Sequence, residues 1–278
     1  MKLLRYGVLG SEKVGALDAN GHIRDLSLLV PNLTPEWLAP ERLRALAAID
    51  LERMPLVDDS VRLGVPVAGT RQFMAVGLNY RVHAQEAGLD IPEEPVVFSK
   101  AITSLSGPND DIVLPAGSLE TDWEVELGLI IGTAASKVRE QDALNHVAGY
   151  CVANDVSERN WQMKRNGQWS KGKSFESFGP VGPWLVTADE LPDPQALDME
   201  LKVNGEVRQQ SNTADMIFPV AKLVSYISQF MLLLPGDVII TGTPAGVGLG
   251  MKPPEFLKRG DVMTLRIEQL GEQIQRVV

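Results

Sequence analysis

The sequence predicts an α+β fold that is rich in strands, with a mixed β-roll or barrel as its main domain. From about residue 71, short strand-like runs such as PVVFSK, WEVELGLIIG and GDVIITG are separated by Gly and Pro turns. Helical periodicity appears only in short pieces, chiefly VREQDALNHV and FPVAKLVSYISQFMLLL. Many strands with few helices argue against an alternating, doubly wound sheet. The 278 residues, 44% hydrophobic and 22% charged, have ordinary globular composition.

Two unequal domains are expected, residues 1–70 as a small N-terminal α/β domain and residues 71–278 as the catalytic domain. The segment YGVLGSEKVGALDANGHIRDLS predicts two short strands around an Asn-Gly pair, which is typical of hairpins. The segment TPEWLAPERLRALAAIDLERM predicts a helix with Thr34 as N-cap and Pro35 at the first helical position. The Asn-Gly pair in LKVNGEVRQQ predicts another hairpin.

The charge and the apolar segments exclude several classes of partner. A net charge of −10 and a pI near 4.9 leave no basic stripe for nucleic acid. The N-terminal MKLLRYGVLGSEKVG has no apolar core typical of a signal peptide, and the most apolar runs are far shorter than the roughly 20 residues that span a bilayer. The single cysteine, Cys151, excludes an intrachain disulfide and has the apolar context of an inert core residue. We therefore expect a cytoplasmic protein.

The stretch DWEVELGLIIG, residues 122–132, poses the main question about function. Side chains alternate along a strand, so Glu124 and Glu126 share one face with Asp122. Taken alone, this alternation is typical of a half-exposed strand. Two carboxylates at i and i+2 repel each other, however, and a hard divalent cation would turn that repulsion into ligation. Nothing in the sequence assigns Asp122 the role of a ligand.

Asp155 is the third candidate ligand, because it follows the apolar run GYCVAN at the end of a predicted strand. The alternative is a turn or helix cap, for which Asn-Asp before Ser is also suitable. An E-x-E strand and a neighbouring Asp would supply three oxygen ligands and leave positions open for water or substrate. Such a set suits Mg²⁺ or Mn²⁺, and the chain has no Cys/His cluster for structural zinc.

Further candidate residues lie in two polar segments. His83 and Glu86 are three apart in GLNYRVHAQEAG and would share a face of a short helix, where a carboxylate can orient an imidazole and raise its basicity. Taken alone, such a pair is more often structural. The following AGLDIPEEP has the composition of a mobile lid. In GQWSKGKSFESFG, Lys173 could bind a substrate carboxylate or stabilise an oxyanion, whereas Lys171 is better interpreted as a solvated loop residue.

The Gly-rich segment TGTPAGVGLG fits neither the dinucleotide fingerprint, since Met251 stands where a third glycine is needed, nor a Walker loop. We expect it to bring backbone N–H groups and the hydroxyl of Thr243 close to a small ligand.

These segments occur in a recognisable order. VGLNYRVHAQEAG, PVVFSK, SGPNDDIVLP, DWEVELGLIIG, GYCVANDVSERNWQ, GKSFESFGPVGPW and PGDVIITGTPAGVG make residues 71–278 resemble the fumarylacetoacetate hydrolase family. The resemblance implies a β-roll catalytic domain of the fumarylacetoacetase C-terminal type, a homodimer, and one Mg²⁺, Mn²⁺ or Ca²⁺ in each active site. The residues that match the family's functional positions are the metal ligands Glu124, Glu126 and Asp155, the dyad His83 and Glu86, the lysine Lys173, and the substrate contacts Gln162 and Thr243. One departure is Glu176, where many relatives have Asp.

The resemblance also implies a reaction, the hydrolysis of a C–C bond in a 2,4-dioxo acid of the acylpyruvate class to pyruvate and a second acid. The motifs look most like those of bacterial members that act on 2,4-diketo-3-deoxy sugar acids such as the rhamnonate or fuconate derivatives. A decarboxylase of the oxaloacetate type, an isomerase of the 2-hydroxyhepta-2,4-diene-1,7-dioate type and a ureidoglycolate lyase are the alternatives. Isomerising members need not keep the dyad, so His83 and Glu86 favour bond cleavage. A non-catalytic module with a structural cation site is the third hypothesis.

Overall fold

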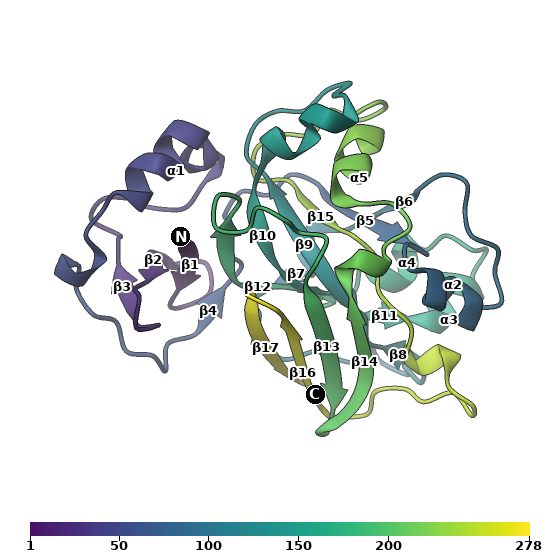
Figure 1. Ribbon diagram of the computed structural model, residues 1–278. Coiled ribbons are helices and arrows are strands. Elements are labelled where there is room, and N and C mark those ends of the chain that lie inside the picture. The colour runs from purple at the N-terminus through teal and green to yellow at the C-terminus, as the bar shows by residue number, and fades with distance from the viewer.

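The computed structural model describes all 278 residues, and a large mixed sheet is its framework (Figure 1). Its main path runs β3-β2-β1-β12-β10-β9-β15-β5-β6, with β4 paired to β1 and β7 to β12. The pairs β5–β15 and β7–β12 are parallel, and the others are antiparallel. The strands of this sheet are β1 (Lys2–Tyr6), β2 (Lys13–Leu17), β3 (Ile23–Asp25), β4 (Leu63–Gly64), β5 (Phe73–Gly77), β6 (Val96–Lys100), β7 (Leu105–Ser106), β9 (Val125–Ile131), β10 (Val147–Asn154), β12 (Gly179–Thr187) and β15 (Val238–Ile240).

A second, antiparallel sheet packs against the middle of the first. Its strands contact β9, β10 and β12, and side chains from both sheets enter the largest core cluster. The order is β14-β13-β16-β17, formed by β13 (Asp198–Val203), β14 (Glu206–Asn212), β16 (Val262–Ile267) and β17 (Gly271–Arg276). A short antiparallel pair, β8 (Thr121–Asp122) and β11 (Ser157–Glu158), lies beside three short helices that are described next (Figure 1). The predicted β-rich α+β fold is therefore confirmed.

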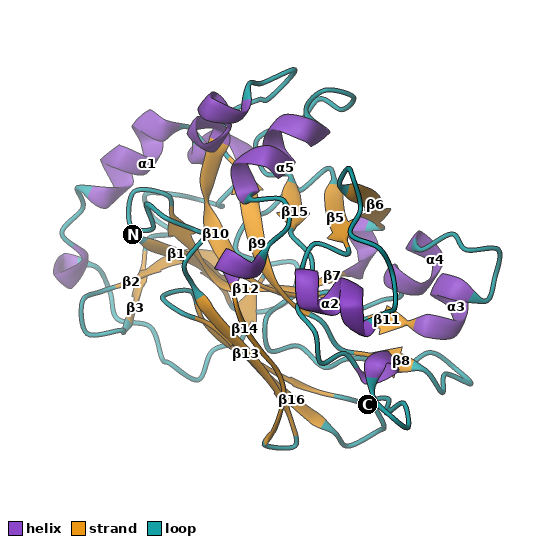
Figure 2. Cartoon of the chain, turned by 45° about the vertical axis from the view of Figure 1, so that its right-hand side comes forward, coloured by secondary structure: helices purple, strands orange, loops and turns teal.

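The helices are short, and none has both the length and the apolar character that crossing a bilayer requires. The α2, α3 and α4 helices lie together near β8 and β11 in both views (Figures 1 and 2). The α-helices are α1 (Pro40–Ala47), α2 (Arg81–Glu86), α3 (Arg159–Met163), α4 (Ser170–Lys173) and α5 (Val220–Ile227). The 3-10 helices are Pro35–Leu38, Leu51–Arg53, Ile102–Ser104, Glu140–His146, Thr213–Asp215 and Gly248–Gly250.

Both predicted Asn-Gly hairpins are confirmed, but the single helix predicted after Thr34 is wrong. A 3-10 turn ends at Leu38, and α1 starts separately at Pro40. The cause is local: the residue before a proline is pushed out of the α region, and Ala39 has φ −59° and ψ 137°. Thr34 makes no cap to the backbone; its hydroxyl bonds the Glu36 carboxylate instead. VREQDALNHV forms a 3-10 helix rather than an α-helix.

The strands of residues 1–70 join the large sheet through β1, which pairs with β12. Arg62 adds an ionic link, because its guanidinium binds Glu12 at 3.1 Å and Asp110 at 2.6 Å. The sheet therefore continues across the predicted boundary at residue 70, and a separate N-terminal domain stays a prediction.

The strand β9 is buried on both faces, so the half-exposed interpretation of DWEVELGLIIG is wrong. All residues from 121 to 132 are buried, because β9 lies between β10 and β15 and core side chains cover both of its faces. Leu127 and Leu129 enter the largest core cluster, while Ile130 enters the second one on the opposite face. Glu124 and Glu126 continue the row of Ile130, and their charges are therefore inside the protein.

The anchoring of β9 can be tested by truncating Leu127, which is fully buried. We expect Leu127→Ala to lower the free energy of unfolding by about 2–5 kcal/mol, because the cavity cannot collapse between two packed sheets. Urea unfolding measures the change. The control Leu119→Ala removes a side chain that is 83% exposed and should change stability by less than about 0.5 kcal/mol. Equal effects of the two variants would contradict this packing.

Candidate metal centre

Three carboxylates meet where β9 and β10 run side by side. The register places Glu126 opposite Ala153 and Val125 opposite Asn154, so Asp155, just past the end of β10, reaches the level of Glu124. The Asp155 backbone N–H donates to the Glu124 carbonyl at 2.9 Å, which fixes this approach. One oxygen each from Glu124, Glu126 and Asp155 lie within 4.8 Å of one another, and all three residues are at most 5% exposed.

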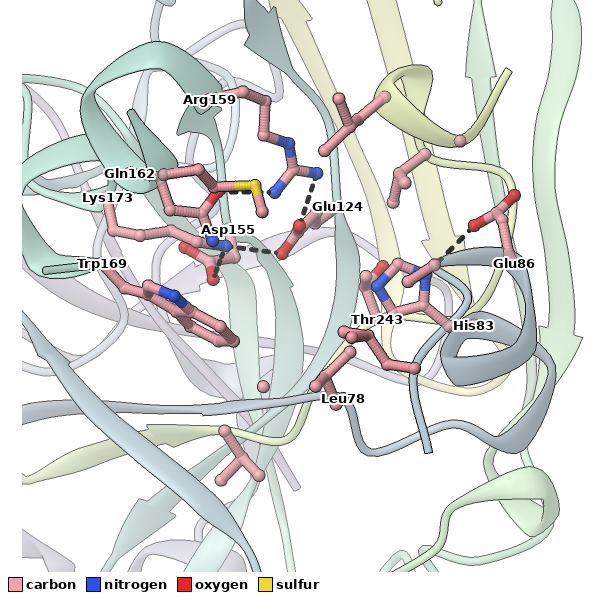
Figure 3. Close-up of a pocket in the computed structure, with 18 of the residues that line it drawn as sticks. Leu78, His83, Glu86, Glu124, Asp155, Arg159, Gln162, Trp169, Lys173 and Thr243 are labelled. Carbon is pink, nitrogen blue, oxygen red and sulfur yellow. Dashed lines mark hydrogen bonds and ion pairs between the residues drawn. The ribbon is translucent and has the colours of Figure 1, made fainter. Parts of the chain in front are cut away.

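Cations from three other elements contact the carboxylates, and Figure 3 shows two of them, Lys173 and Arg159. The Lys173 ammonium at the end of α4 donates to Glu124 at 2.8 Å and to Asp155 at 2.6 Å. Lys100, at the end of β6, donates to the other oxygen of Asp155 at 2.5 Å. Asp155 therefore caps no helix, and the alternative interpretation of Asn-Asp as a cap is wrong. Arg159 in α3 lies 2.7 Å from Glu124.

Asp122 lies on the strand face that it shares with Glu124 but outside the carboxylate cluster. It accepts from the Arg159 guanidinium at 2.9 Å and is paired with it at 2.8 Å. Its role is to neutralise and orient Arg159, which agrees with the lack of any sequence signal for ligation.

The two glutamates differ in their neighbours, and their pKa values move in opposite directions. Burial acts to raise the pKa of Glu124, but Lys173 and Arg159 outweigh it and lower this pKa to about 2. For Glu126, burial and the charges of Asp155 and Glu124 raise the pKa well above its usual range. Burial lowers the pKa of Lys100 despite Asp155, whereas for Lys173 the attraction of Asp155 and Glu124 exceeds the effect of burial and raises the pKa.

The charge balance fits a divalent cation. Arg159 and Asp122 neutralise each other, so three carboxylates face two ammonium groups and one negative charge has no partner. Glu126 is the carboxylate without a cation: one oxygen accepts the Gly242 N–H at 2.7 Å, and the other makes no hydrogen bond within the chain. Three buried carboxylate oxygens at this spacing are a donor set that Mg²⁺ and Mn²⁺ accept.

His83 and Glu86 form the expected pair on α2 and line the same cavity as the carboxylates (Figure 3). His83 Nδ1 lies 3.1 Å from Glu86 Oε2. A carboxylate can only accept, so Nδ1 carries the proton and Nε2 is left as a base. The other Glu86 oxygen accepts the Gly246 N–H at 3.0 Å. A Cβ at position 250 would lie 2.5 Å from Glu86 Cδ, so this side chain needs Gly250 beside it.

The Gly-rich segment serves the protein's own carboxylates. Four of its backbone N–H groups donate to carboxylates of the protein at 2.7–3.0 Å. The sequence predicts that these N–H groups bind a small ligand, but they are already engaged within the chain. The donors are Gly242 to Glu126, Gly246 to Glu86, and Gly248 and Leu249 to Asp122. The Thr243 hydroxyl also lines the cavity, but its proton goes to the Val125 carbonyl at 2.9 Å. It can therefore only accept from a ligand, and it already accepts from Gln209 at 2.8 Å.

Gln162 lines the cavity with one end of its amide engaged. Its carbonyl oxygen accepts from Arg159 at 3.0 Å, and its NH₂ group makes no hydrogen bond within the chain. Lys173 similarly has three N–H donors and uses two on carboxylates. These are the donors still open to a small ligand. Glu176, the departure from the family pattern, is exposed and has no hydrogen bond or ion pair, and so does not alter the centre.

Sequence reasoning missed Lys100, Arg159 and Trp169. Lys100 and Arg159 stand in PVVFSK and VSERN, where a charged residue ends or follows a short strand. That position was the available signal. Trp169 had none, because its place beside the cavity depends on contacts with β5 and β6.

The centre can be tested with Glu126→Gln, because a bound metal ion should reverse the effect of this substitution on stability. Without metal, its raised pKa means that the folded state holds a proton that the unfolded state releases, so stability falls as pH rises above the ordinary carboxyl range. At pH 8 with chelator, Glu126→Gln should therefore be more stable than the natural chain by about 1–3 kcal/mol. With excess Mn²⁺ or Mg²⁺ the order should reverse, because binding stabilises only the natural chain.

Thermal and urea unfolding with and without chelator measure both halves of this prediction. The same order of stability in both conditions would contradict a metal site at Glu126.

Comparison with known proteins agrees with this geometry. The profile described as fumarylacetoacetate (FAA) hydrolase C-terminal matches residues 72–278. A Burkholderia ambifaria protein, for which the class hydrolase is suggested without a substrate, is 58% identical over 276 residues, 99% of this chain and 98% of its own. A fumarylacetoacetate hydrolase from Exiguobacterium antarcticum is 38% identical with a TM-score of 0.88, covering 100% of this chain and 99% of its own.

Two further solved structures differ in the reaction that their names give. One is a maleylpyruvate hydrolase from Sphingobium sp. SYK-6 in complex with manganese(II) and pyruvate, 30% identical with a TM-score of 0.83 and covering 100% and 99% of the two chains. The other is a 2-hydroxyhepta-2,4-diene-1,7-dioate isomerase from Mycobacterium marinum, 32% identical with a TM-score of 0.75 and covering 100% and 98%. The chain belongs to the fumarylacetoacetate hydrolase family, whose members are hydrolases and isomerases of small organic acids.

Proposed function

We propose that this protein is a divalent-metal-dependent hydrolase that cleaves a C–C bond in a 2,4-dioxo acid of the acylpyruvate class. The products are pyruvate and a second acid, and 2,4-diketo-3-deoxy sugar acids such as the rhamnonate or fuconate derivatives are candidate substrates. One observation carries the proposal: a His83–Glu86 dyad shares a cavity with three buried, clustered carboxylates. The pyruvate and manganese(II) bound to the Sphingobium hydrolase support it.

In this proposal Glu124, Glu126 and Asp155 hold Mg²⁺ or Mn²⁺. When bound, the cation supplies Lewis acidity to the carboxylate and 2-oxo oxygens of the substrate, which stabilises negative charge on the departing pyruvate portion. Two buried ammonium groups, Lys100 and Lys173, balance the charges of Asp155 and Glu124. A divalent cation would change the net charge of the centre from −1 to +1, which suits a substrate carboxylate.

His83 acts first as a general base. Its Nε2 takes a proton from a water that attacks C4, while Glu86 holds the Nδ1 proton and stabilises the imidazolium. The free N–H of Lys173 and the NH₂ of Gln162 are the donors available to the oxygen on C4. The C3–C4 bond then breaks and its electron pair stays on C3. His83 Nε2 returns the proton to C3, which gives the methyl group of pyruvate and the second acid.

An isomerase is the second candidate, because the Mycobacterium marinum neighbour carries that name. Isomerisation moves a double bond and releases no acid, so product analysis separates the two. No specific observation favours an oxaloacetate decarboxylase or a ureidoglycolate lyase. We also propose that the protein is cytoplasmic and a homodimer. Sedimentation of the purified chain tests the oligomeric state.

The decisive experiment is a product assay. The purified protein is incubated with 2,4-dioxopentanoate and 2,4-diketo-3-deoxyrhamnonate, with Mg²⁺, with Mn²⁺ or with chelator. We expect one pyruvate for each second acid, and no turnover with chelator. Release of CO₂, or a shifted double bond without acid release, would reject the hydrolase in favour of a decarboxylase or an isomerase.

The dyad is tested by His83→Gln. Loss of the base should lower kcat by about 10²–10⁴-fold, while the stabilisation by Mn²⁺ is retained because His83 is not a ligand. The control is His146→Gln, since His146 bonds the carbonyls of Thr133 and Ala134 outside the cavity. It should leave kcat within about twofold. A His83→Gln enzyme with nearly full kcat would exclude the dyad as the base.

A further inference from the structure

We infer that the part of the substrate beyond C4 is uncharged and ends in an apolar group, so that the natural substrate has a single carboxylate. This inference rests on the proposed function, because it assigns the substrate class of the same site. The evidence is the set of side chains that line the cavity. The carboxylate cluster, Arg159, Lys173 and the dyad line part of it, and eight apolar side chains make up much of the rest: Val76, Leu78, Leu89, Phe98, Met163, Trp169, Val247 and Leu249.

Part of the apolar lining is a packed aromatic wall formed by Trp169 and Phe98. Trp169 packs edge-on against Phe98 with ring centroids 5.4 Å apart, and Phe98 in turn lies 5.3 Å from the Lys173 ammonium. The Trp169 ring also lies against the backbone of β5, since a Cβ at position 77 would be only 2.3 Å from it. Gly77 therefore makes room for the indole. Trp169 lies beside Lys173 and Asp155 (Figure 3), so the wall begins directly next to the polar centre.

Each cation that lines the cavity is already paired with carboxylates of the protein, so none is left to balance a second substrate carboxylate. Arg159 is paired on several sides: Nε donates to Asp122 and Nη1 to Gln162, while Nη2 makes no hydrogen bond but lies 2.8 Å from Asp122 and 2.7 Å from Glu124 in ion pairs. Lys173 is held by two carboxylates. A second carboxylate would lose its hydration without an ion partner and would face Glu86 and the other acidic groups. A methyl or alkyl end would instead exclude water from the wall.

The neighbouring loop supports the same conclusion. Residues 87–95, AGLDIPEEP, carry three acidic residues and no basic one. Leu89 lines the cavity although it is 51% exposed, and Ile91 in the same loop is 50% exposed. Arg81, at the start of α2, is exposed and does not line the cavity. Closure of this loop would add apolar surface and negative charge, which favours a neutral tail.

The test compares ligands of equal length that differ at one end. 2-Oxoheptanoate and 2-oxoheptanedioate lack the C4 carbonyl and cannot be cleaved, so calorimetry with Mn²⁺ measures binding alone. We expect the monoacid to bind roughly 100-fold tighter or more. The cleavable pair, 2,4-dioxoheptanoate and 2,4-dioxoheptanedioate, should show a similar preference in kcat/KM. A dioate that binds as tightly as the monoacid would overturn the inference.

A matched pair of variants locates the selectivity. Leu89→Arg places a cation at the cavity, and Ile91→Arg places the same charge in the same loop, at a residue of equal exposure that does not line it. Leu89→Arg should reduce the preference for 2-oxoheptanoate by roughly tenfold or more, and Ile91→Arg should change it far less. An equal response of the two variants would overturn the assignment of the wall.

Failure of the inference and failure of the proposed function are separable. If 2,4-dioxopentanoate and both seven-carbon dioxo acids are left uncleaved, the hydrolase proposal fails. The calorimetric comparison of 2-oxoheptanoate with 2-oxoheptanedioate still shows whether the site prefers an uncharged tail. If pyruvate is released but the dioates are preferred, the hydrolase stands and the neutral tail is wrong.

Discussion

The repulsion among buried carboxylates is the constraint on which this structure depends. Glu124, Glu126 and Asp155 bring their oxygens within 4.8 Å of one another where little water screens them. The chain compensates with cations from three other elements: Lys100 ends β6, Arg159 lies in α3, and Lys173 ends α4. The sheet order and the packing of the short helices are therefore conditions for the centre. The protein's own cations leave Glu126 without an ion partner, and the proposed metal ion would compensate this carboxylate.

The Gly-rich loop gives the centre its rigidity. Its N–H groups hold one oxygen of Glu126, one of Glu86 and both of Asp122. Because one loop fixes the metal side and the dyad side together, the distance between the base and the carboxylates is set by backbone geometry. Side-chain freedom at these residues is small before any ligand arrives, which lowers the cost of ordering the site on binding.

Sequence alone could predict which side chains meet on one strand, but not which elements meet in space. The period of two along β9 put Glu124 and Glu126 on one face, and the motif order added Asp155, His83 and Lys173. The burial of β9 on both faces was not predictable from its alternation, because that depends on the second sheet and on β15. The same limit hid the Lys100–Asp155 contact, which joins residues 55 positions apart. The break before Pro40 was visible locally, since a proline there disfavours helix in the preceding residue.

Residues around the centre differ in how well they tolerate a single substitution. Each of Lys173, Arg159 and Asp122 binds at least two partners, so replacing one leaves a buried charge without compensation. The dyad and the wall are different: His83 has one ring nitrogen free, and the side chains of Trp169 and Leu89 make no hydrogen bond or ion pair within the chain. Among structural neighbours named for hydrolysis and for isomerisation, the fold is kept at 30–32% identity. Because the charge network couples the carboxylate centre to the packing of the sheet and the short helices, we expect differences in reaction and in substrate to arise at the dyad and the wall.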